Sequence, residues 1–330
     1  MKRTLTKWAA LTAFLLVLSA GIPAQSAVDS AKQLFDAGRF KDAEALLRAE
    51  AVKNPSDPAL QYWLGKCAFE LYDDDLAFSS AERAVELDPK NAEYHHFLGT
   101  TAGYKAEHSN WFSGLSLARK TQHEFLIAVE LNPNSLDAQR DLISYYIAAP
   151  GIAGGGDEKA QAQITQLDVL HVVSARLARL ELYESRKKWT EAENEAKSVL
   201  AARPKQLKTF LELAEFYQNR EDATGMRNAL AAVPPGAPAD LHVAYFRGVA
   251  DVIAGENLPE AQKAFMAYLS GQPPPRREDH VTLGDAHSWL GTLYLKLGQR
   301  SSAMSECRAA LKLEPKNRYA RECIRRIDSQ

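Results

Sequence analysis

The chain has 330 residues, of which 46% are hydrophobic and 25% charged, with 40 basic side chains against 42 acidic ones. This composition is typical of a folded soluble chain with an ordinary apolar core. It excludes a nucleic-acid-binding surface, because affinity for nucleic acid comes from clustered Lys and Arg, and the sequence shows no basic stripe.

The first 27 residues predict a secretory signal peptide that is cleaved after Ser26 or Ala27. A basic start precedes an apolar run over 8–20 and a stretch of small residues. The apolar run is shorter than the roughly 20 residues that a membrane-spanning helix needs. Without Lys2, Arg3 and Lys7 the mature chain carries 37 basic and 42 acidic side chains. We therefore expect an exported protein, in the periplasm or secreted, with no membrane contact beyond the signal peptide.

One position recurs along the chain with mostly small residues. It is occupied by Ala31, Gly65, Gly99, Ile143, Leu180, Ala214, Gly248 and Gly291, which gives steps of 34, 34, 44, 37, 34, 34 and 43. A period of 34 is typical of paired helices that bury their apolar faces only by stacking. The pattern predicts eight units and a C-terminal capping helix. The units lie near 28–56, 58–90, 91–134, 135–172, 173–205, 206–240, 241–274 and 279–316, and the cap covers 317–328.

The last unit has the most complete set of signature residues. It reads Trp289-Leu290-Gly291, then Tyr294, Gly298, Ala303, Ala310 and the terminating Pro315. The chain thereby resembles the tetratricopeptide repeat family, of the exported bacterial type, over 28–330. This resemblance implies an all-α solenoid, wound as a right-handed superhelix, whose concave face binds protein segments.

The longer steps predict insertions that leave the stack as loops. The step of 44 places about ten extra residues between the helices of the third unit, around 107–114. A longer turn is expected at 149–157. The step of 43 indicates a stiff, exposed linker over 273–279, in which Arg276 and Arg277 are a detail of the loop.

Three cysteines are too few for a disulfide framework. Cys307 and Cys323 fall on consecutive predicted helices, so they can pair across that hairpin or serve as small apolar residues of the core. The sequence leaves both alternatives open. The aspartates at 73–75 are expected to cap the second helix of their unit.

Fragments that imitate catalytic motifs each lack a required residue. His123-Glu124 begins a zinc-protease motif, but Ile127 stands where the second ligand belongs. The glycines of 151–156 are followed by two acids, where a phosphate loop needs Lys and Ser or Thr. His95 is interpreted as a packed or hydrogen-bonded side chain. We expect no catalytic residue, no cofactor and no metal, and therefore no enzyme.

The concave groove is expected three residues before and one residue after each recurring position. This rule selects Tyr62, Lys66, His96, Thr100, Arg140 and Ser144, then Leu177, Glu181, Leu211 and Glu215. The N-terminal half of this groove is basic and aromatic, which suits an acidic or aromatic peptide, whereas the middle is acidic and aliphatic. The Lys and Asn pattern of the family's carboxylate clamp is absent.

These observations favour a non-enzymatic scaffold or adaptor of the bacterial cell envelope that binds a protein or peptide. An alternative is an accessory subunit or enzyme with its site on the loops at 107–114 and 149–157. A further alternative is membrane contact through Trp111 and Phe112. The partner's identity and the oligomeric state remain open at this point.

Overall fold

The computed structural model describes residues 24–234, 240–271, 276–277 and 281–329. The predicted signal peptide lies largely outside these residues. Within them the regular secondary structure is helical. The helices are α1 (Ala24–Asp36), α2 (Phe40–Lys53), α3 (Pro58–Glu70), α4 (Asp74–Leu87), α5 (Ala92–Glu107), α6 (Trp111–Leu131), α7 (Leu136–Ala148), the short 3-10 helix η1 (Gly151–Ala153), α8 (Asp157–Leu170), α9 (Val172–Ser185), α10 (Trp189–Ala201), α11 (Leu207–Asn219), α12 (Ala223–Ala231), α13 (Leu241–Ala254), α14 (Leu258–Leu269), α15 (Leu283–Lys296), α16 (Arg300–Leu313) and α17 (Arg318–Asp328). None of the helices in the described ranges combines the length and apolar character that crossing a bilayer requires.

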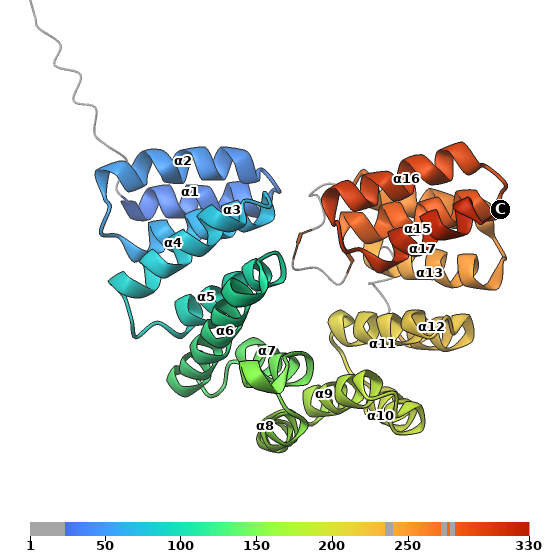
Figure 1. Ribbon diagram of the computed structural model, residues 1–330, viewed down its shortest axis with the longest axis horizontal. Helices are drawn as coiled ribbons and strands as arrows, with labels where there is room; N and C mark the ends of the chain where they lie inside the picture. The colour runs from blue at the N-terminus through green and yellow to red at the C-terminus, as the bar shows by residue number, and fades with distance from the viewer. Residues whose placement is uncertain (1–23, 235–239, 272–275, 278–280, 330) are drawn as a thin grey trace, which may run out of the picture.

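Consecutive helices pair and the pairs stack, which confirms the predicted α-solenoid (Figure 1). Small residues permit the close crossings. A Cβ added at Gly99 would lie 2.5 Å from the Phe125 ring, and one added at Gly291 would lie 2.3 Å from Cys307 Sγ. The recurring small position therefore marks the places where one helix crosses another.

Two features of the turns agree with the sequence. Gly38 and Gly298 have φ values of 70° and 74°, in the left-handed region that favours glycine. Asp73 caps α4, since its side chain accepts a hydrogen bond from the Leu76 N–H. These local signals start and stop helices at the places expected.

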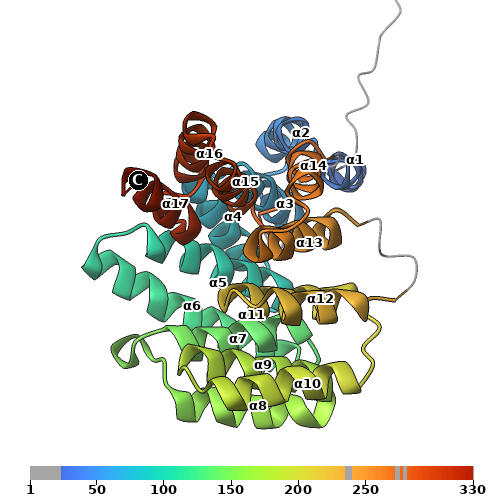
Figure 2. The same cartoon turned by 90° about the vertical axis from the view of Figure 1, so that its right-hand side faces the viewer.

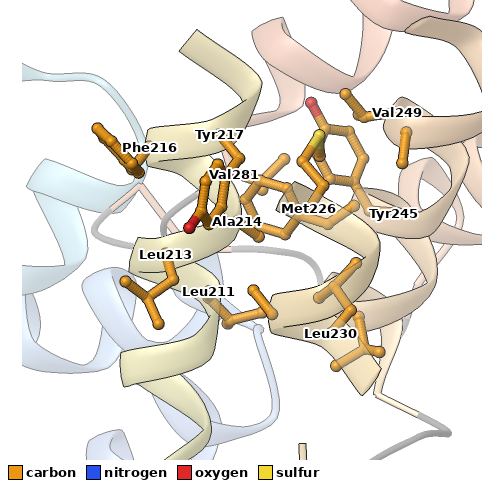
Figure 3. Close-up of a cluster of buried hydrophobic side chains, with 14 of the residues drawn as sticks. Leu211, Leu213, Ala214, Phe216, Tyr217, Met226, Leu230, Tyr245, Val249 and Val281 are labelled. Atoms are coloured by element: carbon orange, nitrogen blue, oxygen red, sulfur yellow. The ribbon is translucent and has the colours of Figure 1, made fainter. Parts of the chain in front are cut away.

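The apolar core runs along the solenoid as successive clusters of buried side chains. Figure 3 shows part of one cluster, in which Phe216 and Tyr217 of α11, Met226 of α12 and Tyr245 of α13 lie between adjacent pairs. Each cluster is shared between neighbouring pairs. No pair therefore buries its apolar face by itself.

The extra residues of the third unit do not form the predicted loop at 107–114. They extend the two helices instead, so that α5 has 16 residues, α6 has 21, and only 108–110 connect them. Asn110 caps α6 by accepting a hydrogen bond from the Ser113 N–H at 3.2 Å. A helix continues when each added residue finds its backbone partner, and the cap starts α6 early enough to absorb the insertion.

The solenoid makes about one full turn and its two ends come together (Figures 1 and 2). Arg277, between α14 and α15, is 8% exposed and lies against α3 and α4. Its guanidinium donates to the Phe69 carbonyl at 3.1 Å and to Asp74 Oδ1 at 2.6 Å, and its backbone N–H donates to Glu70 Oε2 at 2.8 Å. We call this contact the clasp. The prediction of an exposed loop was wrong for Arg277, and the rest of 273–279 apart from Arg276 lies outside the described residues.

Three aromatic rings surround the guanidinium of the clasp. The Arg277 Cζ lies 4.4 to 4.6 Å from the ring centroids of Phe69, Tyr72 and Tyr104. Arg276 forms a more exposed ion pair with Asp36 at 3.1 Å. A buried cation paired with Asp74 and surrounded by three rings, with a second carboxylate on its backbone N–H, is a specific contact rather than a chance approach of two surfaces.

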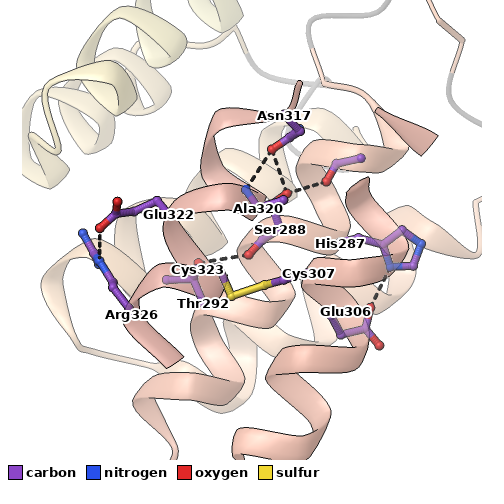
Figure 4. The surroundings of a disulfide bond; sticks show 11 residues. His287, Ser288, Thr292, Glu306, Cys307, Asn317, Ala320, Glu322, Cys323 and Arg326 are labelled. Carbon is purple, nitrogen blue, oxygen red and sulfur yellow. Dashed lines mark hydrogen bonds and ion pairs between the residues drawn. A yellow bond between two sulfur atoms is a disulfide. The ribbon is translucent and has the colours of Figure 1, made fainter. Parts of the chain in front are cut away.

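Cys307 and Cys323 form a disulfide between α16 and α17, with their Cα atoms 6.4 Å apart (Figure 4). This settles the alternative that the sequence left open. The bond ties the capping helix to the last helix pair. Cys67 is a free, buried thiol whose pKa is raised to about 12, chiefly by burial.

Candidate functional site

The inner surface of the solenoid is lined mainly by the first helix of each pair and contains two adjoining cavities. One, of about 840 Å³, lies over α3, α5 and α7, and the other, of about 600 Å³, lies over α7, α9 and α11. Both are lined by Asp137, Asp141, Ser144 and Lys208. We call the two together the groove.

All six residues selected from the sequence line the groove, which places them together although they come from three repeats. Tyr62, Lys66, His96 and Thr100 line the first cavity, Arg140 lines the second, and Ser144 lines both. Leu177, Glu181 and Glu215 line the second cavity, whereas Leu211 is buried in the core.

Most of these side chains also bind one another or their neighbours. Tyr62 is only 7% exposed, and its hydroxyl donates to Glu93 Oε1 at 2.6 Å. The Lys66 Nζ lies 5.2 Å from the centroid of the Phe97 ring. His96 Nε2 lies 2.7 Å from Asp141 Oδ2. The first cavity therefore presents fewer accessible cations than the sequence suggested.

Arg140 differs most from its expected role. Its guanidinium lies 3.0 Å from Glu212 Oε2 and 3.7 Å from Glu181 Oε2, and Ser144 donates to Glu181 at 3.0 Å. Three neighbouring helices contribute to this network. Two carboxylates from the next repeats thus balance the charge of Arg140, and its role in binding an acidic peptide stays a prediction.

Burial changes the protonation of the carboxylates in the second cavity. Burial raises the pKa of Glu181 to about 7, although Arg140 and the Ser144 hydroxyl favour its ionised form. The pKa of Glu184 is also raised by burial, against a hydrogen bond from Asn219. These shifts are typical of several acids crowded into a partly dehydrated space.

Four of the groove residues that sequence reasoning missed are acidic. Asp141 and Glu212 stand two positions before the recurring residues Ile143 and Ala214, next to the position that was selected. Asp137 and Glu184 lie about one turn further along their helices. Because a helix presents neighbouring turns to the same surface, a wider window of positions would have included all four.

The two stretches predicted as alternative loop sites, 107–114 and 149–157, both contain helical structure. The stretch at 107–114 is mostly helical, and Trp111 and Phe112 lie in the first turn of α6 with exposed fractions of 66% and 83%. The turn at 149–157 contains η1 and is held by a hydrogen bond from the Tyr145 hydroxyl to the Ala153 carbonyl at 2.6 Å. In the part of the chain that is described, no three His, Cys, Asp or Glu side chains converge in a way that could hold a metal ion.

His95 is a packed, hydrogen-bonded residue. Its Nδ1 lies 2.6 Å from Glu124 Oε2 and its Nε2 lies 3.0 Å from the Pro89 carbonyl. The side chains of His95 and Glu124 are both buried. The interaction joins α5 to α6. His95 thus links the two helices of the third pair and does not face the groove.

Comparisons with known proteins agree with this architecture. Two models of the tetratricopeptide repeat match residues 28–92 and 284–317. The sequence matches no curated protein. Among solved structures, yeast Tom70 aligns with 98% of this chain and 66% of its own, at 12% identity and a TM-score of 0.61.

Two other similar structures are tetratricopeptide repeat proteins of bacteria. The one from Parabacteroides merdae is 14% identical, with 93% of this chain and 99% of the other aligned and a TM-score of 0.49. The one from Thermus thermophilus is 22% identical, with 58% and 98% aligned and a TM-score of 0.47. The chain thus carries tetratricopeptide repeats at both ends, and the described helices between them are paired and stacked in the same way.

Proposed function

We propose that this protein is an exported, non-enzymatic scaffold whose groove binds an extended protein segment rich in Lys and Arg. Tetratricopeptide repeat proteins generally mediate protein interactions, so a protein ligand is the starting expectation. The leader pattern in residues 1–27 supports export to the cell envelope or the medium. The basic character of the ligand is our inference from the charges of the groove.

The observation that carries this proposal is the excess of carboxylates in the second cavity. Its acidic side chains are Asp137, Asp141, Glu181, Glu184, Glu212 and Glu215, and its basic ones are Arg140 and Lys208. Arg140 is paired with Glu212 and Glu181, and Lys208 with Asp137 at 3.7 Å. A cationic segment would meet complementary charge there, and an acidic one would be repelled.

The test is capture of native partners by the purified protein, followed by mass spectrometry of the cross-linked segment. The variant Glu181→Gln/Glu184→Gln changes two carboxylates of the groove while retaining their shape. We expect it to reduce the amount of partner captured at pH 8, above the pKa of about 7 of Glu181, at least fivefold, because charge pairs with the ligand are lost. The cross-linked peptides should be rich in Lys and Arg.

A matched control is Glu191→Gln/Glu260→Gln, which changes two exposed carboxylates at the starts of α10 and α14. It alters the net charge equally and should leave capture unchanged. Equal loss in both variants, or an acidic cross-linked segment, would contradict the proposal.

A further inference from the structure

A third cavity, of about 740 Å³, lies where the two ends of the solenoid meet. Its lining comes from both ends. The first repeats contribute Tyr72, Asp74, Tyr104, Glu107 and His108. The later repeats contribute Glu215, Gln218, Asn219, Tyr245, Arg277, Val281, Thr282, Asp285 and the segment 312–319. The cavity exists only because the ends come together at the clasp. We call it the closure cavity.

Three polar atoms of residues that line the closure cavity are buried without a hydrogen-bond partner in the protein. Tyr245 is completely buried and its hydroxyl has no partner. Gln218 is 5% exposed, and its Oε1 has none although its Nε2 donates to the Tyr319 hydroxyl at 2.7 Å. Glu314 Oε1 also lacks a partner. Since leaving such groups unpaired is costly, each of them needs a partner from the cavity, which is either water or a ligand.

The unpaired atoms are mainly acceptors, and their surroundings are acidic. Asn317 Nδ2 donates to Asp285 Oδ1 at 2.9 Å and to Glu314 Oε2 at 3.0 Å, which holds the two carboxylates near each other. Burial and the neighbouring Glu314 raise the pKa of Asp285 to about 6. A positively charged ligand would relieve the repulsion between these two groups.

The cations near the closure cavity already have partners or are exposed. Arg277 is held by Glu70 and Asp74. Lys316 donates to the Glu107 carbonyl, and Arg318 contacts Asn219 and the Tyr319 hydroxyl. Lys312 is exposed to solvent. Asp285 and Glu314 thus face the cavity as neighbouring carboxylates that share the Asn317 amide as their donor.

We propose that the closure cavity binds a compound with a primary ammonium group. Such a group has three N–H donors, which match the unpaired oxygens of Gln218, Tyr245 and Glu314. A guanidinium binds best through both oxygens of one carboxylate, and Glu314 has already engaged Oε2 with Asn317. The ammonium belongs either to a free alkyl amine or to a lysine side chain of a partner. This inference does not depend on the function proposed for the groove.

The experiment is calorimetric titration of the full mature protein with 1,5-diaminopentane and, separately, with a short peptide that contains one lysine. Saturable 1:1 binding of either probe is expected. Binding of the diamine alone indicates a free amine, and binding of the peptide indicates a lysine side chain. The neutral 1,5-pentanediol, of the same length, should not bind. Absence of saturable binding by both amines overturns the proposal.

Three variants locate the site. Glu314→Gln should weaken binding of the amine at least tenfold, as expected for loss of a charged hydrogen bond. Tyr245→Phe should weaken it several-fold and leave the melting temperature unchanged or higher, since that hydroxyl has no partner in the protein. Glu306→Gln, which removes a carboxylate paired with His287 outside the cavity, should bind normally. Equal binding by Glu314→Gln and the unchanged protein contradicts the assignment.

Discussion

Individual side chains in this protein take their properties from neighbouring repeats. Glu181 illustrates the point: it lies on α9, yet Arg140 on α7 and Glu212 on α11 determine the charges around it. Its pKa of about 7 results from burial between these helices, which outweighs the attraction of Arg140. The behaviour of this carboxylate therefore reports on the packing of three consecutive pairs.

Glu181 should make the stability of the protein depend on pH. Because its pKa in the folded state lies above the ordinary value of 4.5, the folded protein holds this proton more tightly than the unfolded chain. The resulting stability is complete below about pH 4.5 and is lost as the pH rises to about 7. The free energy of unfolding of Glu181→Gln, relative to the unchanged protein, should therefore increase between pH 5 and pH 8.

Chemical denaturation with urea at both pH values measures this difference. Glu191→Gln is the matched control, because it removes an exposed carboxylate of the next helix. Parallel pH profiles for the unchanged protein and Glu181→Gln would show that the carboxylate is not held as the structure indicates.

At the scale of the element, the repeat places a residue with positive φ between the two helices of most pairs. Glycine fills this position at Gly38, Gly255 and Gly298, whereas Tyr72, Lys187 and Glu221 adopt the same region with φ of 53° to 61°. The turn geometry is thus retained where glycine is absent. In those pairs the packing of the helices offsets the conformational free energy of a non-glycine residue with positive φ.

Replacing one of these residues by glycine should stabilise its pair. Lys187 is exposed and its φ is 57°, so Lys187→Gly relieves a strain of about 1–2 kcal/mol against a loss of backbone entropy of about 0.4–1 kcal/mol. We expect a net gain of roughly 0.5–1 kcal/mol in the free energy of unfolding. Thermal and urea unfolding of Lys187→Gly and Lys187→Ala are compared, since alanine removes the same side chain without relieving the backbone. A less stable glycine variant would contradict this account.

At the scale of the whole molecule, the clasp converts an open spiral into a nearly closed one. Arg277 reaches Phe69, which is 208 positions away in the sequence, and Lys316 reaches the Glu107 carbonyl. The groove and the closure cavity both lie on the inner side of this turn. A ligand would therefore reach the groove either along the axis of the superhelix or after the two ends have separated.

Removing the clasp should open the solenoid without unfolding its repeats. Arg277→Ala loses the ion pair with Asp74 and three ring contacts, which are worth about 1–3 kcal/mol for a partly buried charge. Each helix pair keeps its contacts with its neighbours. We expect a larger radius of gyration by small-angle X-ray scattering and an unchanged helical circular dichroism signal.

Arg276→Ala is the control for this experiment, because its exposed pair with Asp36 contributes little. An Arg277→Ala variant with the radius of gyration of the unchanged protein would show that the ends are held by other contacts.

The sequence alone was sufficient for the helix pairs, most of their turns and part of the lining of the groove. These features depend on glycines, caps and apolar spacing within about 34 residues, and such local signals can be read without knowing the path of the chain. The insertion near Trp111 was misjudged because nothing in its spacing distinguishes a loop from two longer helices.

Only the tertiary structure decided the charge of the groove, the pairing of Cys307 with Cys323 and the contact of Arg277 with the first repeats. The disulfide and the charges of the groove depend on how neighbouring helices are oriented against each other. The Arg277 contact depends on a distance that accumulates from a small rotation at every repeat, and no single unit encodes that sum. For the same reason the closure cavity, with Tyr245 on one side and Tyr104 on the other, has no signature in the sequence.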